Sequence, residues 1–116
     1  MRPTRITYDP DGDVLYVNFG QPTASAGYQL SDQILLRVDP QAQIAAGLTI
    51  FNYSLHASAA REIPLPVIEE QQGDTKALLL KILRSTPLNQ FLTIVIRKEG
   101  IFANLRSPSL QQAVGG

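Results

Sequence analysis

The chain has 116 residues, of which 44% are hydrophobic, and its ten basic and ten acidic side chains cancel. This length fits one domain with a core, and a zero net charge gives no general attraction to nucleic acid or membranes. The absence of cysteine excludes disulfides, thiol catalysis and cysteine-bound zinc. No apolar run reaches the roughly 20 residues that span a bilayer, and the first residues lack the apolar segment of a secretory signal. We therefore expect a cytoplasmic protein.

Charge is distributed unevenly along the chain. Residues 1–57 contain three arginines and five aspartates, a net charge of −2, whereas residues 76–106 contain six basic side chains and Glu99 alone, a net charge of +5. Two solvated faces explain this pattern, and attraction between subunits is the alternative. The basic segment has no helix-turn-helix and no aromatic RNA-binding motif, which disfavours nucleic acid as a partner.

The first predicted element is a β-hairpin. A short strand ending at Tyr8 is followed by the turn Asp9-Pro10-Asp11-Gly12, in which proline presets φ and Gly12 is expected to adopt a positive φ. Residues 14–19 then supply β-branched and aromatic side chains to a second strand. Both faces of this strand are apolar, so it belongs in a sheet interior or at an interface.

Two more strands are predicted after a loop at residues 20–27. The first spans residues 34–39 and ends at a second Asp-Pro turn, and the other spans residues 44–53. Gly47 within the last strand indicates a bulge or a close approach of the backbone. Turns at these intervals predict a four-stranded antiparallel meander.

The second half of the chain is expected to add one main helix. Two prolines keep residues 63–67 extended as part of a connector. Asp74 is a suitable N-cap for a helix to about Arg84. Leucine and isoleucine side chains fall on one stripe of this helix, whereas Leu80 falls among its lysines and arginine. Leu80 is thus an apolar residue where water is expected, unless something covers it.

The chain is predicted to end in a further helical turn and a hairpin. Thr86 and Pro87 favour the start of a helical turn. Residues 91–98 and 101–106 form the hairpin around Glu99-Gly100. The fold class is therefore α+β, with a four-stranded antiparallel β-meander, one main α-helix and a C-terminal β-hairpin. We expect a single domain over 1–116, made of the meander (1–57), a connector (58–73), the helix plus hairpin (74–106) and a tail (107–116).

A family resemblance rests on three groups of residues. These are Tyr8-Asp9 with Asp13, then Leu15-Tyr16-Val17, then Ile34, Leu36 and Asp39 followed by Gly47, Leu48 and Ile50. Over about residues 5–57 the chain resembles the small bacterial family called domain of unknown function 2283. The resemblance implies a small antiparallel sheet with a helix, and no established activity. Some members lie beside toxin-like genes, which implies partner binding.

One position departs from the family pattern. The family shows an acidic residue after a glycine and a hydrophobic residue, and this chain has Thr49 there. Any role of that carboxylate is missing from this chain.

Asp9, Asp11 and Asp13 alternate in the first turn, and three carboxylates on one loop could bind Ca²⁺ or Mg²⁺. The spacing imitates the start of an EF-hand loop. The match then fails, because the glycine stands at the fourth position and Gly20, not glutamate, at the twelfth. Turn and capping chemistry is the alternative explanation for these aspartates.

His56 is the single histidine and could act as a general base. Ser54 and Ser58 flank it at two residues, so the three side chains share one face if this segment is extended. No catalytic motif surrounds them, and a histidine at the end of a strand is the simpler interpretation. The sequence assigns no catalytic residue and no cofactor.

The four tyrosines lie in the β half and could line a pocket, an interface or the core. Because the strands are apolar on both faces and one helix cannot cover both, the hairpin or a second subunit must supply another layer. We therefore expect a homodimer, with an interface drawn from Tyr16, Phe51, Tyr53 and Leu80.

The function remains unknown at this point. The sequence favours a non-catalytic, self-associating protein-interaction module, with another protein as a further possible partner. The alternative is a small metal- or ligand-binding enzyme that uses the turn at Asp9, Asp11 and Asp13, or His56.

Overall fold

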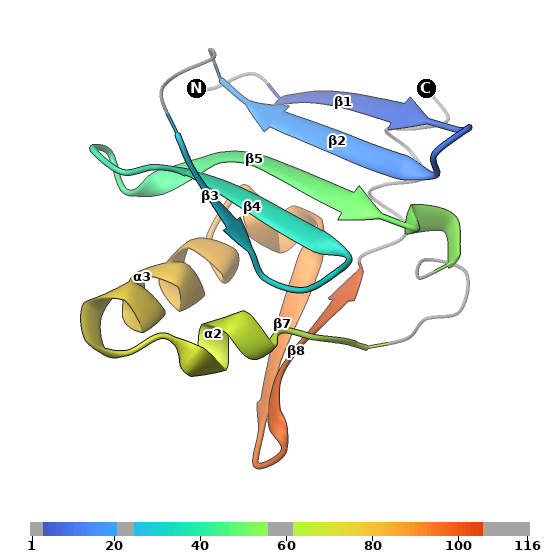
Figure 1. Cartoon of the computed structure of the whole chain (residues 1–116). Helices are drawn as coiled ribbons and strands as arrows, with labels where there is room; N and C mark the ends of the chain where they lie inside the picture. The colour runs from blue at the N-terminus through green and yellow to red at the C-terminus, as the bar shows by residue number, and fades with distance from the viewer. Residues whose placement is uncertain (1–3, 21–24, 56–61, 106–116) are drawn as a thin grey trace.

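Two antiparallel sheets form the framework of the structure, a computed structural model that describes residues 4–20, 25–55 and 62–105. The larger sheet has five strands and the smaller has three. The helices and the smaller sheet lie on one face of the larger sheet (Figure 1). The elements in chain order are β1 (Thr4–Asp9), β2 (Val14–Phe19), β3 (Ala26–Gln29), β4 (Ile34–Asp39), β5 (Ile44–Phe51), β6 (Ile63–Pro64), α2 (Pro66–Glu70), α3 (Gly73–Leu83), the 3₁₀ helix η1 (Leu88–Gln90), β7 (Leu92–Arg97) and β8 (Gly100–Leu105).

The α+β class and the antiparallel pairing are confirmed, but the predicted meander is wrong. The strand order in the larger sheet is β1-β2-β5-β4-β3, so β5 lies between β2 and β4. Burial explains this order, because β5 is buried at Ala45 and at the four successive positions from Gly47 to Ile50, whose side chains alternate between the two faces. A strand with little exposed surface on either face is most stable in the centre of a sheet.

β3 was predicted as loop and is an edge strand. It spans four residues, includes Gly27 and pairs with β4 alone. Small and polar residues have a low intrinsic preference for strands, so β3 forms because it pairs with β4 and not because of its local sequence. β5 ends at Phe51, two residues earlier than predicted, because Asn52 has a φ of 54° and turns the chain out of the sheet.

Gly47 marks a bulge and a close approach, as its sequence context predicted. Arg37 pairs with Gly47, but Val38 pairs with Ala45, so Ala46 is the extra residue on β5. A Cβ atom at Gly47 would also collide with the Arg37 guanidinium, which lies across the glycine.

The connector is shorter and more helical than predicted. Only Ile63 and Pro64 are extended, and they pair with β8. Pro66 instead begins α2, because the first helical position tolerates a residue that lacks an N–H. Helix α3 ends near Arg84 as predicted, but Asp74 lies in its first turn and is not its N-cap. Within the described residues, neither helix has the length and apolar character to cross a membrane.

The chain ends in an antiparallel pair of strands, β7 and β8. Their turn is Lys98-Glu99 rather than the predicted Glu99-Gly100, because Gly100 already pairs with Arg97. The turn predicted at Thr86-Pro87 is the 3₁₀ helix η1, which begins after Pro87. The predicted tail at 107–116 lies outside the described residues.

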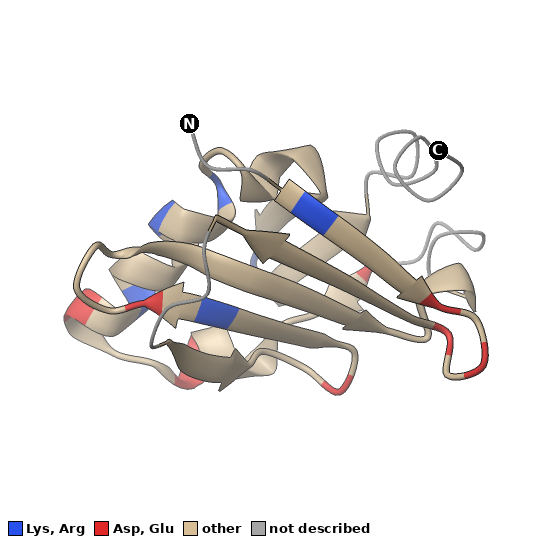
Figure 2. Ribbon diagram, turned by 90° about the horizontal axis from the view of Figure 1, so that it is seen from above, with Lys and Arg blue, Asp and Glu red and all other residues tan. Residues whose placement is uncertain are grey.

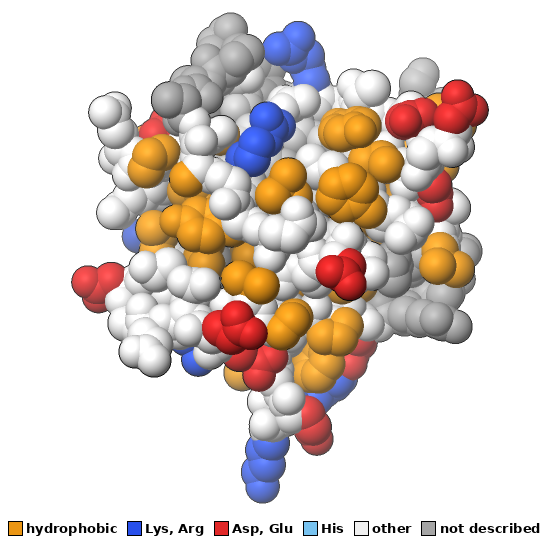
Figure 3. Space-filling view, in the orientation of Figure 1, with side chains coloured by type: hydrophobic (Ala, Val, Ile, Leu, Met, Phe, Trp, Pro, Cys, Tyr) orange, Lys and Arg blue, Asp and Glu red, His pale blue; other side chains and the backbone are white. Residues whose placement is uncertain are grey.

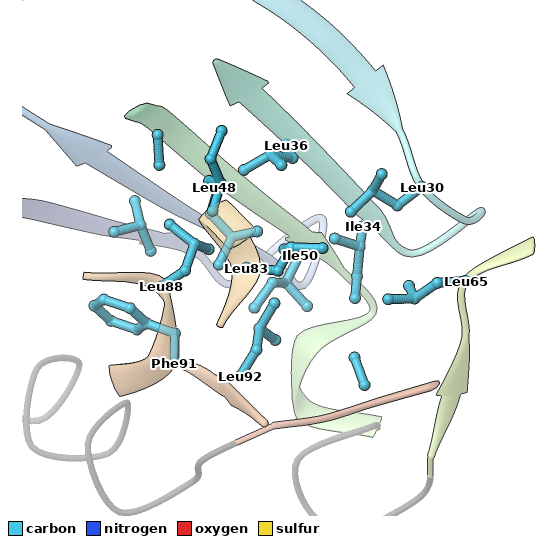
Figure 4. Close-up of a cluster of buried hydrophobic side chains, with 14 of the residues drawn as sticks. Leu30, Ile34, Leu36, Leu48, Ile50, Leu65, Leu83, Leu88, Phe91 and Leu92 are labelled. Atoms are coloured by element: carbon cyan, nitrogen blue, oxygen red, sulfur yellow. The ribbon is translucent and has the colours of Figure 1, made fainter. Parts of the chain in front are cut away.

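One hydrophobic core joins both halves of the chain. It lies between the larger sheet and the layer formed by α3, η1 and the smaller sheet (Figure 4). Leu79, Ile82 and Leu83 face it from α3, whereas Leu80 is half-buried and packs against it. Leu80 is therefore partly covered within its own chain, as the sequence allowed if another part of the structure packed over it.

Two leucines of α3 give a matched test of this core. Leu83→Ala should lower the free energy of unfolding by about 2–5 kcal/mol, because a fully buried leucine leaves a cavity. Leu80→Ala should lower it by less than half as much, since solvent reaches part of its side chain. Urea denaturation measures both. Equal losses would contradict the placement of Leu80 at the border of the core.

Candidate functional site

The larger sheet has one covered and one uncovered face. The register places Leu15, Leu48 and Leu36 on the covered face toward the core. The opposite face of β1–β5, called the outer face below, has no described helix or strand in front of it (Figure 2). In the part of the chain that the structure describes, no second layer covers this face.

The centre of the outer face is apolar. Tyr16 on β2 pairs with Thr49 on β5, which pairs with Leu35 on β4. Val14 and Phe51 form the next pair toward the first turn. Tyr16 remains 38% exposed, whereas Thr49 is only 5% exposed beneath its neighbours. The space-filling view shows hydrophobic patches separated by polar side chains on the side that faces the viewer (Figure 3).

Charged side chains flank this apolar centre at its two ends. Arg5 pairs with Asn18, and Arg37 lies in the same row across Gly47. The Arg37 guanidinium donates a hydrogen bond to Asn18 Oδ1, which holds it flat against the sheet. Asp9 lies on the outer face of β1 at the opposite end, next to the acidic β1–β2 turn (Figure 2). The outer face is thus basic toward one end of its strands and acidic toward the other.

A hydrogen-bonded cluster forms beside the acidic end. The Tyr8 hydroxyl donates to Asp13 Oδ1 at 2.6 Å. Ser54, just after β5, donates its N–H to Oδ1 at 3.0 Å and its hydroxyl to Oδ2 at 2.8 Å. The N–H of Tyr53 donates to the Asp13 carbonyl, and the Tyr53 ring packs edge-on against Tyr8 at 5.9 Å. Asp13 therefore ties the β1–β2 turn to the end of β5.

Residues 5–54 match the family Protein of unknown function (DUF2283). This segment, called the DUF2283 segment below, holds β1 to β5 and less than half of the chain. The match confirms the resemblance drawn from the first hairpin and the strands that follow. Comparison with curated proteins and with solved structures finds no match. The family description states no activity, so the match by itself assigns no biochemical role.

Two residues that carry the family resemblance, Tyr8 and Asp13, lie in this cluster. Asp13, rather than Gly12, has the positive φ, at 55°. Aspartate tolerates that conformation because its short side chain hydrogen-bonds locally. Ser54 was considered only as a neighbour of His56, and its bond to Asp13, 41 residues away, required the pairing of β2 with β5.

The electrostatics of the cluster suit structure rather than proton transfer. Partial burial raises the pKa of Asp13, but the hydrogen bonds from Tyr8 and Ser54 outweigh it and hold the pKa below its ordinary value. The hydrogen bond to Asp13 and then burial raise the pKa of the Tyr8 phenol. A general base works best with a pKa near the working pH, so an acidified Asp13 is a poor base for the Ser54 hydroxyl.

The three aspartates of the first turn do not form a shared pocket. Asp9 accepts a hydrogen bond from the N–H of Asp11, and both oxygens of Asp13 accept bonds from Tyr8 and Ser54. Within residues 4–20, 25–55 and 62–105, no three acidic or histidine side chains are grouped as metal ligands. The hydrogen bonds of Asp9 and Asp13 agree with the explanation that these aspartates stabilise the turn. His56 and Ser58 lie outside the described residues.

The predicted interface residues separate into three locations. Tyr16 and Phe51 lie on the outer face. Tyr53 is 7% exposed and belongs to the core, because the chain turns at Asn52 and directs it inward. Leu80 packs against the core from α3. The structure therefore brings two of the four together and removes Tyr53 from the exposed surface.

Two surface depressions of the described residues are lined by both apolar and polar side chains. One of about 220 Å³ lies between the β4–β5 turn and the end of α3, with Lys81 as its charged side chain. Another of about 360 Å³ lies between the β3–β4 turn and α2, with Asp32 as its charged side chain. Beside that charge, each depression has three uncharged polar side chains, which are Gln43, Ser85 and Thr86 in the first and Gln29, Ser31 and Gln33 in the second.

Tyr8→Phe tests the role assigned to the cluster. It removes a donor to Asp13, so the Asp13 pKa should rise toward its ordinary value and the free energy of unfolding at neutral pH should fall. A depressed pKa stabilises the fold above the unfolded pKa of about 4 and loses that contribution as the pH falls through the folded value. The stability difference between wild type and Tyr8→Phe should therefore shrink below about pH 4.

Urea titrations across pH and NMR titration of the Asp13 carboxyl measure these effects. Tyr28→Phe is the matched control, because the described structure gives the Tyr28 hydroxyl no hydrogen bond. An Asp13 pKa that stays unchanged in Tyr8→Phe would contradict the assigned role.

Proposed function

We propose that this protein is a non-catalytic protein-interaction module that forms a homodimer through its outer face. The observation that carries this proposal is the apolar centre around Tyr16, Leu35 and Phe51, with no described layer in front of it. Burial of apolar side chains is the main driving force of association. Two such sheets can pack face to face as the layers of a β-sandwich do.

The charges of the outer face favour a second copy of the chain as the occupant. A two-fold axis parallel to the sheet and perpendicular to its strands reverses the strand direction of the second copy. Arg5 and Asp9 lie four residues apart on the same face of β1. This rotation places the basic end of each copy over the acidic end of the other, so Arg5 faces Asp9 of the second copy and Asp9 faces its Arg5. The same rotation places Arg37 of each copy toward Asp32 of the other copy, which is exposed in the turn before β4.

The position of Thr49 supports the same arrangement. It lies in the middle of the outer face, where the family pattern has an acidic residue, and it is almost fully buried by Tyr16 and its other neighbours. A carboxylate at the centre of a face-to-face contact would lose its hydration and oppose association. A threonine avoids that penalty in this chain.

Tyr16→Lys is expected to abolish association through the outer face while the fold is retained. It places a charge at an exposed position in the centre of the proposed contact. Ala77→Lys, on the exposed surface of α3, is the matched control and should leave the dimer unchanged. Sedimentation velocity at micromolar concentration measures the masses, and circular dichroism measures the fold. A wild-type protein that stays monomeric would refute the proposal, as would a Tyr16→Lys dimer as tight as wild type.

A charge exchange on β1 tests the orientation of the two copies. Arg5→Asp should weaken the dimer at low salt, because it brings two aspartates together at each end of the contact. The double variant Arg5→Asp with Asp9→Arg should restore it, since the attraction is rebuilt with the signs exchanged. The dissociation constant at two salt concentrations measures this effect. A double variant as weak as the single one would exclude the antiparallel orientation.

Thermal melting with added Ca²⁺ or Mg²⁺ separates this proposal from a metal-dependent enzyme. A ligand that binds the native state raises the melting temperature. A monomer that is stabilised by millimolar metal would favour the alternative function based on the acidic turn.

A further inference from the structure

A second surface, separate from the outer face, lies on the smaller sheet. The strand order β6-β8-β7 makes β7 an edge strand of that sheet. β7 is rich in β-branched residues, contains no proline or glycine, and has a single charged residue at its end, Arg97. Exposed edges are usually blocked by proline, charge or short length. β1 carries Arg5 and Asp9 on its edge and β3 is short, so β7 is the least protected of these edges.

The turn of the hairpin determines which backbone groups face the free edge. Arg97 and Gly100 enclose the two-residue turn Lys98-Glu99. Residues that flank such a turn exchange hydrogen bonds with each other, and this pattern repeats at every second residue. The N–H and C=O groups of Val95 therefore point to β8, whereas those of Ile94 and Ile96 point to the free edge. Within the described residues, no other backbone group pairs with Ile94 or Ile96.

We infer that β7 pairs with β7 of a second copy, antiparallel and centred on Val95. A two-fold axis perpendicular to the sheet then places Ile94 opposite Ile96 of the second copy, and Ile96 opposite its Ile94. Both residues have free N–H and C=O groups, so each of these pairs exchanges backbone hydrogen bonds. Val95 faces its own copy across the axis, and the smaller sheet becomes one continuous sheet of two chains.

The side chains of this strand complement each other in the same arrangement. Ile96 is 55% exposed, on the face that carries the buried Leu92 and Ile101. A depression of about 180 Å³ lies beside β7, lined by residues that include Leu83, Leu92 and Ile94. In the paired strands, Ile96 of the second copy lies next to Ile94, at this depression. Its apolar side chain thus gains a partly apolar site in each copy, as a two-fold contact requires.

Charge at the tip of the hairpin fits this pairing. The β7–β8 hairpin projects from the molecule with charged side chains at its tip (Figure 3). The antiparallel alignment places Glu99 of the second copy past the start of β7, near the side of the depression that Arg84 lines. The opposite charges of Glu99 and Arg84 favour this register over a shifted one.

Amide hydrogen exchange tests the inference on the full chain in the Tyr16→Lys background, so that failure of the outer-face dimer does not affect the result. The amides of Ile94 and Ile96 should become protected as protein concentration rises. The amides of Thr93 and Val95 should be protected at every concentration, because β8 holds them. Equal exchange of Ile94 and Ile96 at low and high concentration would overturn the inference.

Ile96→Lys provides the second arm of the test. It should weaken the association of the Tyr16→Lys protein by roughly tenfold or more, since it places a charge at the paired edge. Leu55→Lys is the matched control, because Leu55 is 53% exposed but lies outside the smaller sheet. Loss of association in both variants, or in neither, would overturn the pairing of β7 with itself.

Discussion

The structure depends on one constraint, which is that the central strands carry apolar side chains on both faces while the described elements supply one covering layer. α3, η1 and the smaller sheet cover the inner face, where Leu48 and Ile50 of β5 are fully buried. No described element remains for the outer face. The residues of β5 on the outer face, Thr49 and Phe51, are uncharged but do not belong to the core. The proposed dimer follows from that imbalance between apolar surface and covering layers.

The Asp13 cluster connects this constraint to the geometry of the sheet. The first turn connects β1 to β2, and Ser54 follows β5, so the bonds of Asp13 to Tyr8 and Ser54 fix the end of three adjacent strands. They do so at the end where Val14 pairs with Phe51 on the outer face. Tyr8 and Asp13, which belong to the first hairpin of the DUF2283 segment, therefore help to shape the outer face at this end. The lowered pKa of Asp13 agrees with this structural role, because the ionised carboxylate is the form that accepts these hydrogen bonds.

Local patterns in the sequence predicted most helices and strands. The features that they did not predict, such as the strand order, depend on contacts between residues that are distant in the sequence. Alternation, the Asp-Pro turns and Gly47 located four strands and the bulge, because each depends on a few adjacent residues. The strand order was wrong because the placement of β5 in the centre depends on burial of the whole sheet. Pro66 was predicted to keep the chain extended, but proline is also favourable at the first position of a helix. It begins α2, which packs against β8 and α3.

The candidate site was predictable to a similar extent. Tyr16 and Phe51 were chosen through the argument that a thin layer cannot cover two faces, and the structure places both on the outer face of the larger sheet. Tyr53 follows the same alternation in sequence but enters the core, because the positive φ at Asn52 breaks the strand before it. Ser54 could not be found at all, since nothing near it in sequence shows that Asp13 lies within hydrogen-bond distance.

The two proposed contacts have different symmetry axes, and this limits the assemblies that the chain can form. The axis of the outer-face contact is parallel to the larger sheet, and the axis of the β7 contact is perpendicular to the smaller one. Each contact is isologous, so each is closed by two copies and leaves the other surface of both copies free. Where the two axes intersect at right angles, four copies close into a dihedral tetramer. Where they intersect at a smaller angle that divides a half-turn evenly, a larger closed dihedral assembly forms, and other relations propagate the contacts into an open assembly. Arg97 is the one charge along β7 and lies at its end, so charge does little to block pairing at this edge. The strength of the edge contact then decides between a simple dimer and these larger assemblies.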